Sequence, residues 1–352
     1  MNEPEFPYVS NATVERLAAR IKGARRVVIT THAKPDGDAL GSVLAVMRSC
    51  AAVGVASEGW LVGPFEPNLL SLAAPAKLEL VDPSKPRLPP DDADLAIVVD
   101  TGAWTQLETF APWLRPRADR TIGFDHHPRG DGVASERIVD VTCGSCTALL
   151  VRLVDALGVP LTFGADARGR GSIAEAVYLG LSTDTGWFRF PNARGPEFAL
   201  AARLLDAGVD KDHIIEVVEQ SHRAERVRIE GRALAGVRFV PLKSGGDVAI
   251  MRLAQSDFRE IGAALEETSG IVNLPMVVAR VRAAILLIET EPTLIKVSFR
   301  SKPKDDAGRF VDVNALAARF GGGGHVHAAG ARIKAPLDEA QARIEAAIAE
   351  LR

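Results

Sequence analysis

The chain has 352 residues, of which 47% are hydrophobic and 25% charged, and this length favours two domains over one. The formal net charge of −3 argues against binding to long nucleic acid, because most of that affinity would come from neutralising phosphates. No apolar run approaches the roughly 18 residues of a membrane span and the first residues form no secretory signal, so we expect a cytoplasmic protein without membrane contact.

The first two hundred residues alternate apolar strands with helices. The strand-like runs are continuously apolar, which is typical of a parallel sheet covered by helices on both faces. We therefore expect an α/β fold over residues 1–209. Strands are predicted at 26–32, 95–100 and 121–127, and helices at 39–54, 144–158, 172–186 and 196–209.

The pattern changes after residue 209. Residues 210–238 are charged and helical, which indicates a connector between domains. Residues 239–352 then read as a smaller mixed α+β domain. Its predicted strands are 247–254, 277–290 and 293–301, followed by a helix at 311–320, a glycine run and a terminal helix from Leu337.

Carboxylates and histidines gather where the predicted strands end. The carboxyl ends of parallel strands lie at one edge of a sheet, so side chains that follow them converge. Two aspartates enter the next helix, whose dipole favours negative charge, and one follows a later helical run. The set is His32, Asp36, Asp38, Asp100, Asp125, His126, His127 and Asp184.

Five aspartates in one place would repel each other without cations, and divalent metals remove that repulsion. Oxygen ligands with a minority of imidazoles suit manganese or magnesium better than zinc. The ligands are too many for one ion, and two ions that share a carboxylate are used for phosphoryl hydrolysis. Each motif alone has an ordinary explanation, such as a capped turn, but together they predict a two-metal site.

Four stretches resemble, in order, the motifs of the DHH phosphoesterases: HAKPDGDALGS at 32–42, VDTG at 99–102, DHH at 125–127 and STDTG at 182–186. The resemblance implies that Asp125 orients a histidine and that His127 faces the scissile phosphate as a donor or acid. It also implies two metal sites bridged by Asp100. One would use His32, Asp36 and Asp100, and the other Asp38, Asp100, His126 and Asp184.

The stretch FGGGGHVHAAG at 320–330 is either a flexible linker or an anion site. Consecutive glycines leave backbone N–H groups free to cradle a phosphate, and His325 can add a donor. In the strand 293–301 the polar residues alternate with apolar ones, so Ser298 and Arg300 face outward, although a solvated edge strand would show the same pattern. The predicted substrate contacts are Ser298, Arg300, Gly322, Gly323, Gly324 and His325.

This second half resembles the DHH-associated C-terminal domain, through SFRS at 298–301 and GGGGHVHAAG at 321–330. The resemblance points to the nanoRNase and pAp-phosphatase branch, where pAp is 3′-phosphoadenosine 5′-phosphate. It implies two Mn²⁺ ions, with Mg²⁺ as the alternative, and an active site in the cleft between the domains. The expected substrates are short 5′-phosphorylated oligonucleotides and pAp, cleaved at P–O3′ bonds to mononucleotides.

Other functions share parts of this pattern. A cyclic di-AMP or pApA phosphodiesterase would carry the same motifs. The sequence also leaves open whether the protein forms a homodimer. The domain with the glycine run argues against a manganese pyrophosphatase. The chain length argues against a long-strand exonuclease, and the intact ligand set argues against a non-catalytic nucleotide sensor. Cys143 and Cys146 form a CxxC without a second pair, which favours packing over a redox or zinc role.

Overall fold

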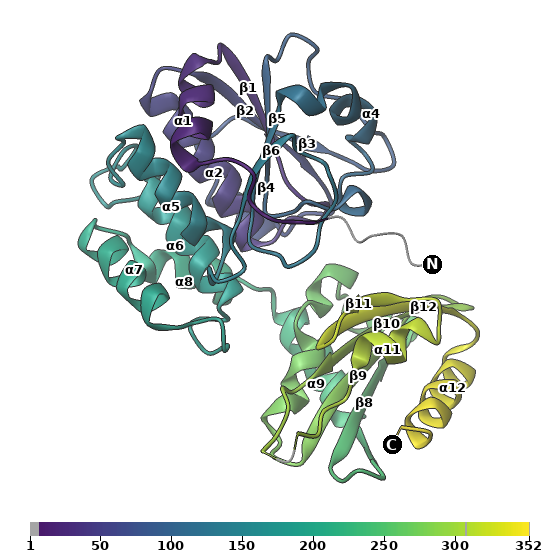
Figure 1. The fold of residues 1–352 in the computed structure, drawn as a ribbon. Coiled ribbons are helices and arrows are strands. Elements are labelled where there is room, and N and C mark those ends of the chain that lie inside the picture. The colour runs from purple at the N-terminus through teal and green to yellow at the C-terminus, as the bar shows by residue number, and fades with distance from the viewer. Residues whose placement is uncertain (1–6, 307, 352) are drawn as a thin grey trace. The chain divides into compact units, whose positions relative to one another are not determined.

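The computed structural model describes residues 7–306 and 308–351, and the chain divides into two compact units, Met1–Ser221 and His222–Arg352 (Figure 1). The division lies inside the segment 210–238, which the sequence predicts to be a connector. This segment carries helix α8 (Lys211–Glu219) in the first unit and helix α9 (Ala224–Ala235) in the second.

A six-stranded parallel sheet forms the centre of the first unit, in the order β3-β2-β1-β4-β5-β6. The predicted α/β fold class is thereby confirmed. The sequence does not predict three of these strands, at residues 56–62, 78–81 and 136–139, because polar residues such as Glu79 interrupt their apolar pattern. The strands are β1 (Arg26–Thr30), β2 (Ala56–Val62), β3 (Leu78–Val81), β4 (Leu95–Val99), β5 (Thr121–Asp125) and β6 (Glu136–Val139).

Helices cover both faces of this sheet (Figure 1). Val27 and Ile29 of β1 join the core under α1, α2, α5 and α6, whereas Val28 packs on the other face with Phe110 and Trp113. None of the helices in the described part of the chain is both long and apolar enough to span a bilayer. The helices are α1 (Val14–Gly23), α2 (Gly37–Ala52), α3 (Pro67–Ser71), α4 (Ala111–Leu114), α5 (Cys146–Leu157), α6 (Ile173–Asp184), α7 (Gly195–Asp206) and α8, with 3₁₀ turns η1 (Trp104–Gln106) and η2 (Arg115–Arg120).

The strand order reverses direction between β1 and β4. From β1 the chain builds outward through β2 to β3, and then returns to add β4, β5 and β6 on the other side. Ligands of open α/β sheets bind beyond the carboxyl ends of the strands at such a reversal. His32 follows β1 and Asp100 follows β4, so the fold places both at this position.

The second unit has a mixed sheet in the order β11-β12-β10-β9-β8-β7, with helices packed on both faces. The strand predicted from residue 277 begins instead at Val281, because residues up to 277 form a 3₁₀ turn that contains Pro275. The strands are β7 (Arg238–Pro241), β8 (Asp247–Leu253), β9 (Val281–Glu291), β10 (Leu294–Ser301), β11 (Gly323–His325) and β12 (Ala328–Lys334). The helices are α9, α10 (Gln255–Ile261), α11 (Val313–Ala318) and α12 (Leu337–Ala349), with 3₁₀ turns η3 (Leu265–Thr268) and η4 (Ile271–Val277).

Candidate metal centre

His32 lies in the loop between β1 and α2, where its ring is held by a backbone group. Its Nδ1 donates to the carbonyl oxygen of Ala33 at 3.0 Å. The Nε2 atom therefore faces the carboxylates of Asp36 at 3.8 Å and Asp100 at 3.5 Å, as expected for a metal-ligating imidazole. Burial lowers the pKa of His32, but Asp100 and Asp36 outweigh burial and raise that pKa to about 9.

Asp36 and Asp38 are both fixed by helix N-termini. Asp36 is the N-cap of α2 and accepts hydrogen bonds from the backbone N–H groups of Asp38 and Ala39, a role for which aspartate is well suited. The buried Asp38 carboxylate accepts from Cys146 N at 2.6 Å and Thr147 N at 3.0 Å, in the first turn of α5. Burial raises the pKa of Asp38, and the nearby carboxylates raise it further, so a cation would stabilise its ionised form.

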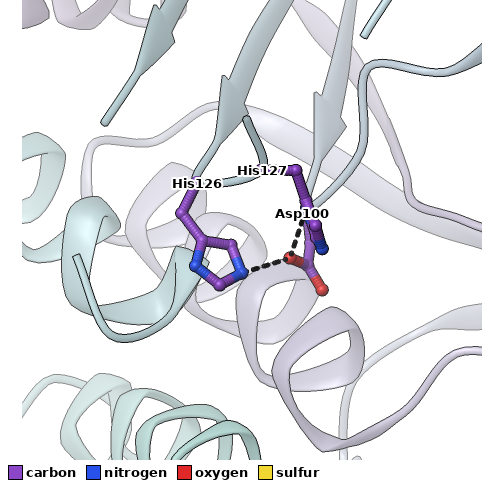
Figure 2. Close-up of side chains that lie close together, drawn as sticks. All are labelled: Asp100, His126 and His127. Atoms are coloured by element: carbon purple, nitrogen blue, oxygen red, sulfur yellow. Dashed lines mark ion pairs between the residues drawn. The ribbon is translucent and has the colours of Figure 1, made fainter. Parts of the chain in front are cut away.

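Asp100 lies between the histidines at the end of β4. Its side chain is 3% exposed and its backbone φ is +59°, a left-handed conformation that is unusual outside glycine. Burial raises the pKa of Asp100, but contacts with His126 and His32 outweigh burial and hold it below its usual value. The buried Oδ1 has no hydrogen-bond donor among the described residues, and His126 Nε2 lies 3.4 Å away (Figure 2).

A second group of ligand atoms surrounds His126. Its Nε2 lies 3.8 Å from Asp38 and 3.9 Å from Asp184, while Nδ1 donates to Cys143 O at 3.3 Å. Burial lowers the pKa of His126, but the carboxylates around it raise the pKa to about 10. Asp184 is the last residue of α6, and the side-chain amide of Asn192 donates to its Oδ2 at 3.3 Å.

Glycines allow α2 and α6 to approach closely enough for their aspartates to meet. A Cβ added at Gly41 would collide with the carbonyl oxygen of Ala176, and one at Gly180 would lie 2.5 Å from Asp38 Oδ1. Any side chain at these positions would force the helices apart. The spacing of Asp38 and Asp184 therefore depends on residues that are not ligands themselves.

Asp125 and His127 are joined by a short hydrogen bond. Asp125 Oδ1 accepts from His127 Nδ1 at 2.7 Å and from the backbone N–H groups of His126 and His127. The other oxygen, Oδ2, accepts the hydroxyl of Tyr8 at 2.7 Å, a partner that no sequence pattern indicates. The His127 side chain is 37% exposed, against 12% for His126, so the two imidazoles have different access to solvent.

The structure brings six residues expected as metal ligands into two separate groups, each with ligand atoms within 4.8 Å of one another: His32, Asp36 and Asp100, and Asp38, His126 and Asp184. A third group combines Asp100 with both imidazoles of the DHH motif (Figure 2), although His127 Nδ1 already bonds to Asp125. The donors are carboxylates with few imidazoles, and Asp100 Oδ1 is buried without a donor. These residues fit divalent cations of the manganese and magnesium type.

The residues expected to contact substrate lie in the second unit on neighbouring strands. Ser298 and Arg300 of β10 pair with Gly330 and Ala328 of β12, and these two pair in turn with Gly323 and His325 of β11. The glycine run is thus an edge strand rather than a linker, and a Cβ at Gly322 or Gly324 would collide with a carbonyl oxygen of β12.

The Arg300 guanidinium has no carboxylate within 4.0 Å among the described residues. Its Nη1 donates to the carbonyl oxygen of Phe299 at 2.9 Å, and the side chain is partly buried. Burial lowers the pKa of Arg300. A partly buried cation without a counter-charge is the natural partner of an anionic ligand.

The CxxC motif and an aromatic pair that follows α6 lie beside the candidate ligands. Cys143 and Cys146 are free cysteines, and the buried Cys146 thiol donates to Phe124 O at 3.3 Å. No metal-type group among the described residues contains a cysteine. Trp187 and Phe188 pack against the core beside Asp184, where Phe188 contacts the rings of Tyr178 and Phe198.

Family models match both halves of the chain, and known proteins match it over most of its length. Residues 26–181 match the model of the DHH family, N-terminal domain, and residues 245–351 match the DHHA1 domain. The "Bifunctional oligoribonuclease and PAP phosphatase NrnA" of Thermus thermophilus is 30% identical over 99% of this chain and 97% of its own length. The Bacillus subtilis protein of the same name is 24% identical over 87% of this chain and 89% of its own length.

The fold also has a close counterpart among solved structures. An exopolyphosphatase-related protein from Bacteroides fragilis has a TM-score of 0.83 at 24% identity, covering 97% of both chains. Both domain models match in order, and the match to a relative at 30% identity extends over almost the full length of both proteins. The chain therefore belongs to the DHH family of phosphoesterases, in the NrnA-like branch that carries a DHHA1 domain.

Proposed function

We propose that this protein is a two-metal phosphoesterase that hydrolyses P–O3′ bonds of short 5′-phosphorylated oligonucleotides and of pAp, and so yields mononucleotides. The observation that carries the proposal is the buried Asp100 carboxylate, which has one oxygen near His32 and the other near His126. The names of the NrnA relatives, as oligoribonucleases and PAP phosphatases, support this class of substrate.

The proposed ligands form two sets that share Asp100. One ion would be held by His32, Asp36 and Asp100, and the other by Asp38, Asp100, His126 and Asp184. Mn²⁺ is the proposed ion, with Mg²⁺ as the alternative, because oxygen donors predominate. When bound, such ions balance the carboxylate charge and polarise the phosphoryl group.

Metal affinity is expected to rise with pH, because the metal-free site binds protons where it would bind metal. The pKa values of His32 and His126 are raised to about 9 and about 10, so both imidazoles are protonated near neutrality and must lose those protons to coordinate. Each displaced proton adds about a tenfold rise in affinity per pH unit below these pKa values.

Calorimetric titration of the metal-free protein with Mn²⁺, in buffers of different ionisation enthalpy near pH 7, measures this release directly. His126→Asn is expected to release fewer protons than the wild-type protein. A titration without proton release would show that these imidazoles are not ligands.

His127 is proposed to donate a proton to the departing 3′-oxygen. Its Nδ1 is engaged by Asp125 at 2.7 Å, which leaves Nε2 as the nitrogen that can meet a substrate. Burial lowers the pKa of His127, but Asp125 and Asp100 outweigh burial and raise it. The imidazole therefore holds its proton more firmly than a free one and can deliver it to a poor leaving group.

The second unit is proposed to bind the 5′-terminal phosphate. Arg300 would supply the uncompensated charge. The proposed donors lie on the adjoining strands or directly before β11, and they are Ser298, the backbone of Gly322, Gly323 and Gly324, and His325. Removing the 3′-phosphate of pAp and cutting the first linkage of a 5′-phosphorylated oligonucleotide break the same P–O3′ bond. One site can therefore carry out both reactions, and a grip on the terminal phosphate restricts substrates to short ones.

Arg300→Ala is expected to raise KM for the dinucleotide pApA by about 10- to 100-fold, the cost of losing a hydrogen-bonded charge pair. The same variant should change KM for ApA, which lacks the 5′-phosphate, by less than about twofold. Steady-state kinetics on the two dinucleotides provide the measurement. Arg238→Ala, at the opposite edge strand β7, is the matched control.

The proposed function is tested by initial rates with Mn²⁺ on pAp, pApA, a five-nucleotide RNA and cyclic di-AMP. Turnover of pAp and the linear oligonucleotides supports the proposal. Preference for cyclic di-AMP over the linear substrates would assign the protein to the cyclic-dinucleotide phosphodiesterases instead. Absence of turnover on all four substrates, in protein that contains metal, would overturn the substrate assignment.

A further inference from the structure

The segment before α1 is fastened along β6, the edge strand of the parallel sheet. The backbone N–H of Asn11 donates to Arg137 O at 3.1 Å, and its side-chain oxygen accepts from Arg137 N at 2.7 Å. Further along the strand, Ser10 Oγ accepts from Val139 N at 2.8 Å. These bonds fix residues 8–11 in place and bring Tyr8 to the carboxyl end of the sheet.

Tyr8 occupies a space that two glycines leave for it. A Cβ at Gly102, in the VDTG motif, would collide with the Tyr8 hydroxyl, and one at Gly130 would lie 2.5 Å from its ring. The Arg137 guanidinium lies 5.6 Å from the ring centre. The phenol is therefore enclosed by the loops that follow β4 and β5.

The Tyr8 hydroxyl completes the hydrogen bonding of Asp125. Oδ1 accepts from His127 Nδ1 and from two backbone N–H groups, and Oδ2 accepts from Tyr8 at 2.7 Å. Burial and the neighbouring Asp125 raise the pKa of Tyr8, so the phenol keeps its proton and acts as the donor. With donors on both oxygens, the carboxylate has a single orientation in which Oδ1 meets the imidazole.

We propose that Tyr8 is a positioning residue for the reaction, which acts through Asp125 to fix the orientation of the His127 imidazole. The hydrogen bonds Tyr8–Asp125–His127 form a continuous chain that starts 117 positions away from Asp125 in the sequence. The inference rests on the proposed role of His127 as proton donor. Tyr8 itself is not proposed to touch the substrate.

Tyr8→Phe removes only the hydroxyl and keeps the ring between the glycines. It is expected to lower kcat on a short 5′-phosphorylated oligonucleotide about tenfold, the size of effect that follows loss of one hydrogen bond to a charged group. KM and bound metal should stay at wild-type values, and the unfolding temperature should fall by no more than the few degrees that one lost hydrogen bond accounts for. The matched control is Tyr178→Phe, which changes the other of the two tyrosines, in α6. Unchanged kcat, or a loss accounted for by lost metal or by unfolded protein at the assay temperature, overturns the proposal.

A double-mutant cycle tests the route through His127. If Tyr8 acts by orienting this imidazole, Tyr8→Phe should cause no further loss of kcat in a His127→Ala background. A full tenfold loss in that background would show that Tyr8 acts by another route, and the proposal would be wrong.

The hydrogen bond itself is testable without turnover. Protein labelled with ¹³Cζ-tyrosine should give two signals, assigned through the two phenylalanine variants. Asp125→Asn is expected to move the Tyr8 signal and leave that of Tyr178 in place. A stationary Tyr8 signal overturns the inference. Failure of the wild-type protein to hydrolyse any nucleotide would instead overturn the proposed function, and the two failures are thus distinguished.

Discussion

Asp100→Ala is expected to lower kcat/KM for pAp and for a five-nucleotide RNA by at least about 10³-fold with Mn²⁺ present, because metal polarisation is worth several kcal/mol. The carboxylate is shared by both proposed ion sites, so its removal weakens both at once. Its two oxygens lie 3.5 Å from His32 Nε2 and 3.4 Å from His126 Nε2, and no other described carboxylate contacts both imidazoles. Initial rates at several Mn²⁺ concentrations and metal content by mass spectrometry provide the measurement.

Asp119→Ala is the matched control, since this aspartate in η2 has a 76% exposed side chain and takes no part in the site. It should retain wild-type rates and metal content. Substantial activity in Asp100→Ala that still depends on Mn²⁺ would contradict a shared ligand. Loss of activity with both metals retained would point to a role other than coordination.

His127→Ala is expected to lower kcat by about 10²- to 10⁴-fold on substrates that release a ribose 3′-oxygen, the usual range for a general acid. The effect should depend on the leaving group. On thymidine 5′-p-nitrophenyl phosphate, which releases a stable phenolate, the variant should lose less than about tenfold, because that oxygen needs no proton as it departs. Comparison of the two substrates with the same enzyme preparation isolates the proton transfer from folding and metal content.

His213→Ala in α8 supplies a histidine control, since this residue contacts Glu216 and none of the candidate ligands. It should leave both rates unchanged. An equal loss on the two substrates by His127→Ala would exclude proton donation and favour ground-state binding of the phosphate. A loss of bound metal would identify His127 as a ligand, as its proximity to Asp100 allows.

The convergence of the candidate metal ligands could be predicted because local sequence features place them. His32, Asp100 and His126 follow apolar strands, and parallel strands end at one edge, so no long-range contact had to be known. Asp36 and Asp38 stand at a helix start, where the sequence pattern is equally clear. The parallel sheet follows from the same continuous apolar runs.

The supporting residues could not be predicted in this way. Tyr8 reaches Asp125 from 117 positions away, and the start of α5 reaches Asp38 from 108 positions away, and neither contact has a periodic signature. Asn192, which contacts Asp184, lies in an irregular turn beyond α6. Gly41 and Gly180 carry a local trace of this layout, since a small residue inside a helix marks a close neighbour without naming it.

The left-handed backbone of Asp100 has a consequence for how the protein can change. A non-glycine residue at φ +59° costs roughly 1 kcal/mol relative to glycine, so the metal-free fold carries a backbone cost at the residue that supplies this carboxylate. Its presence reflects a trade-off in which folding free energy is given up so that one side chain is already in position before any ion arrives.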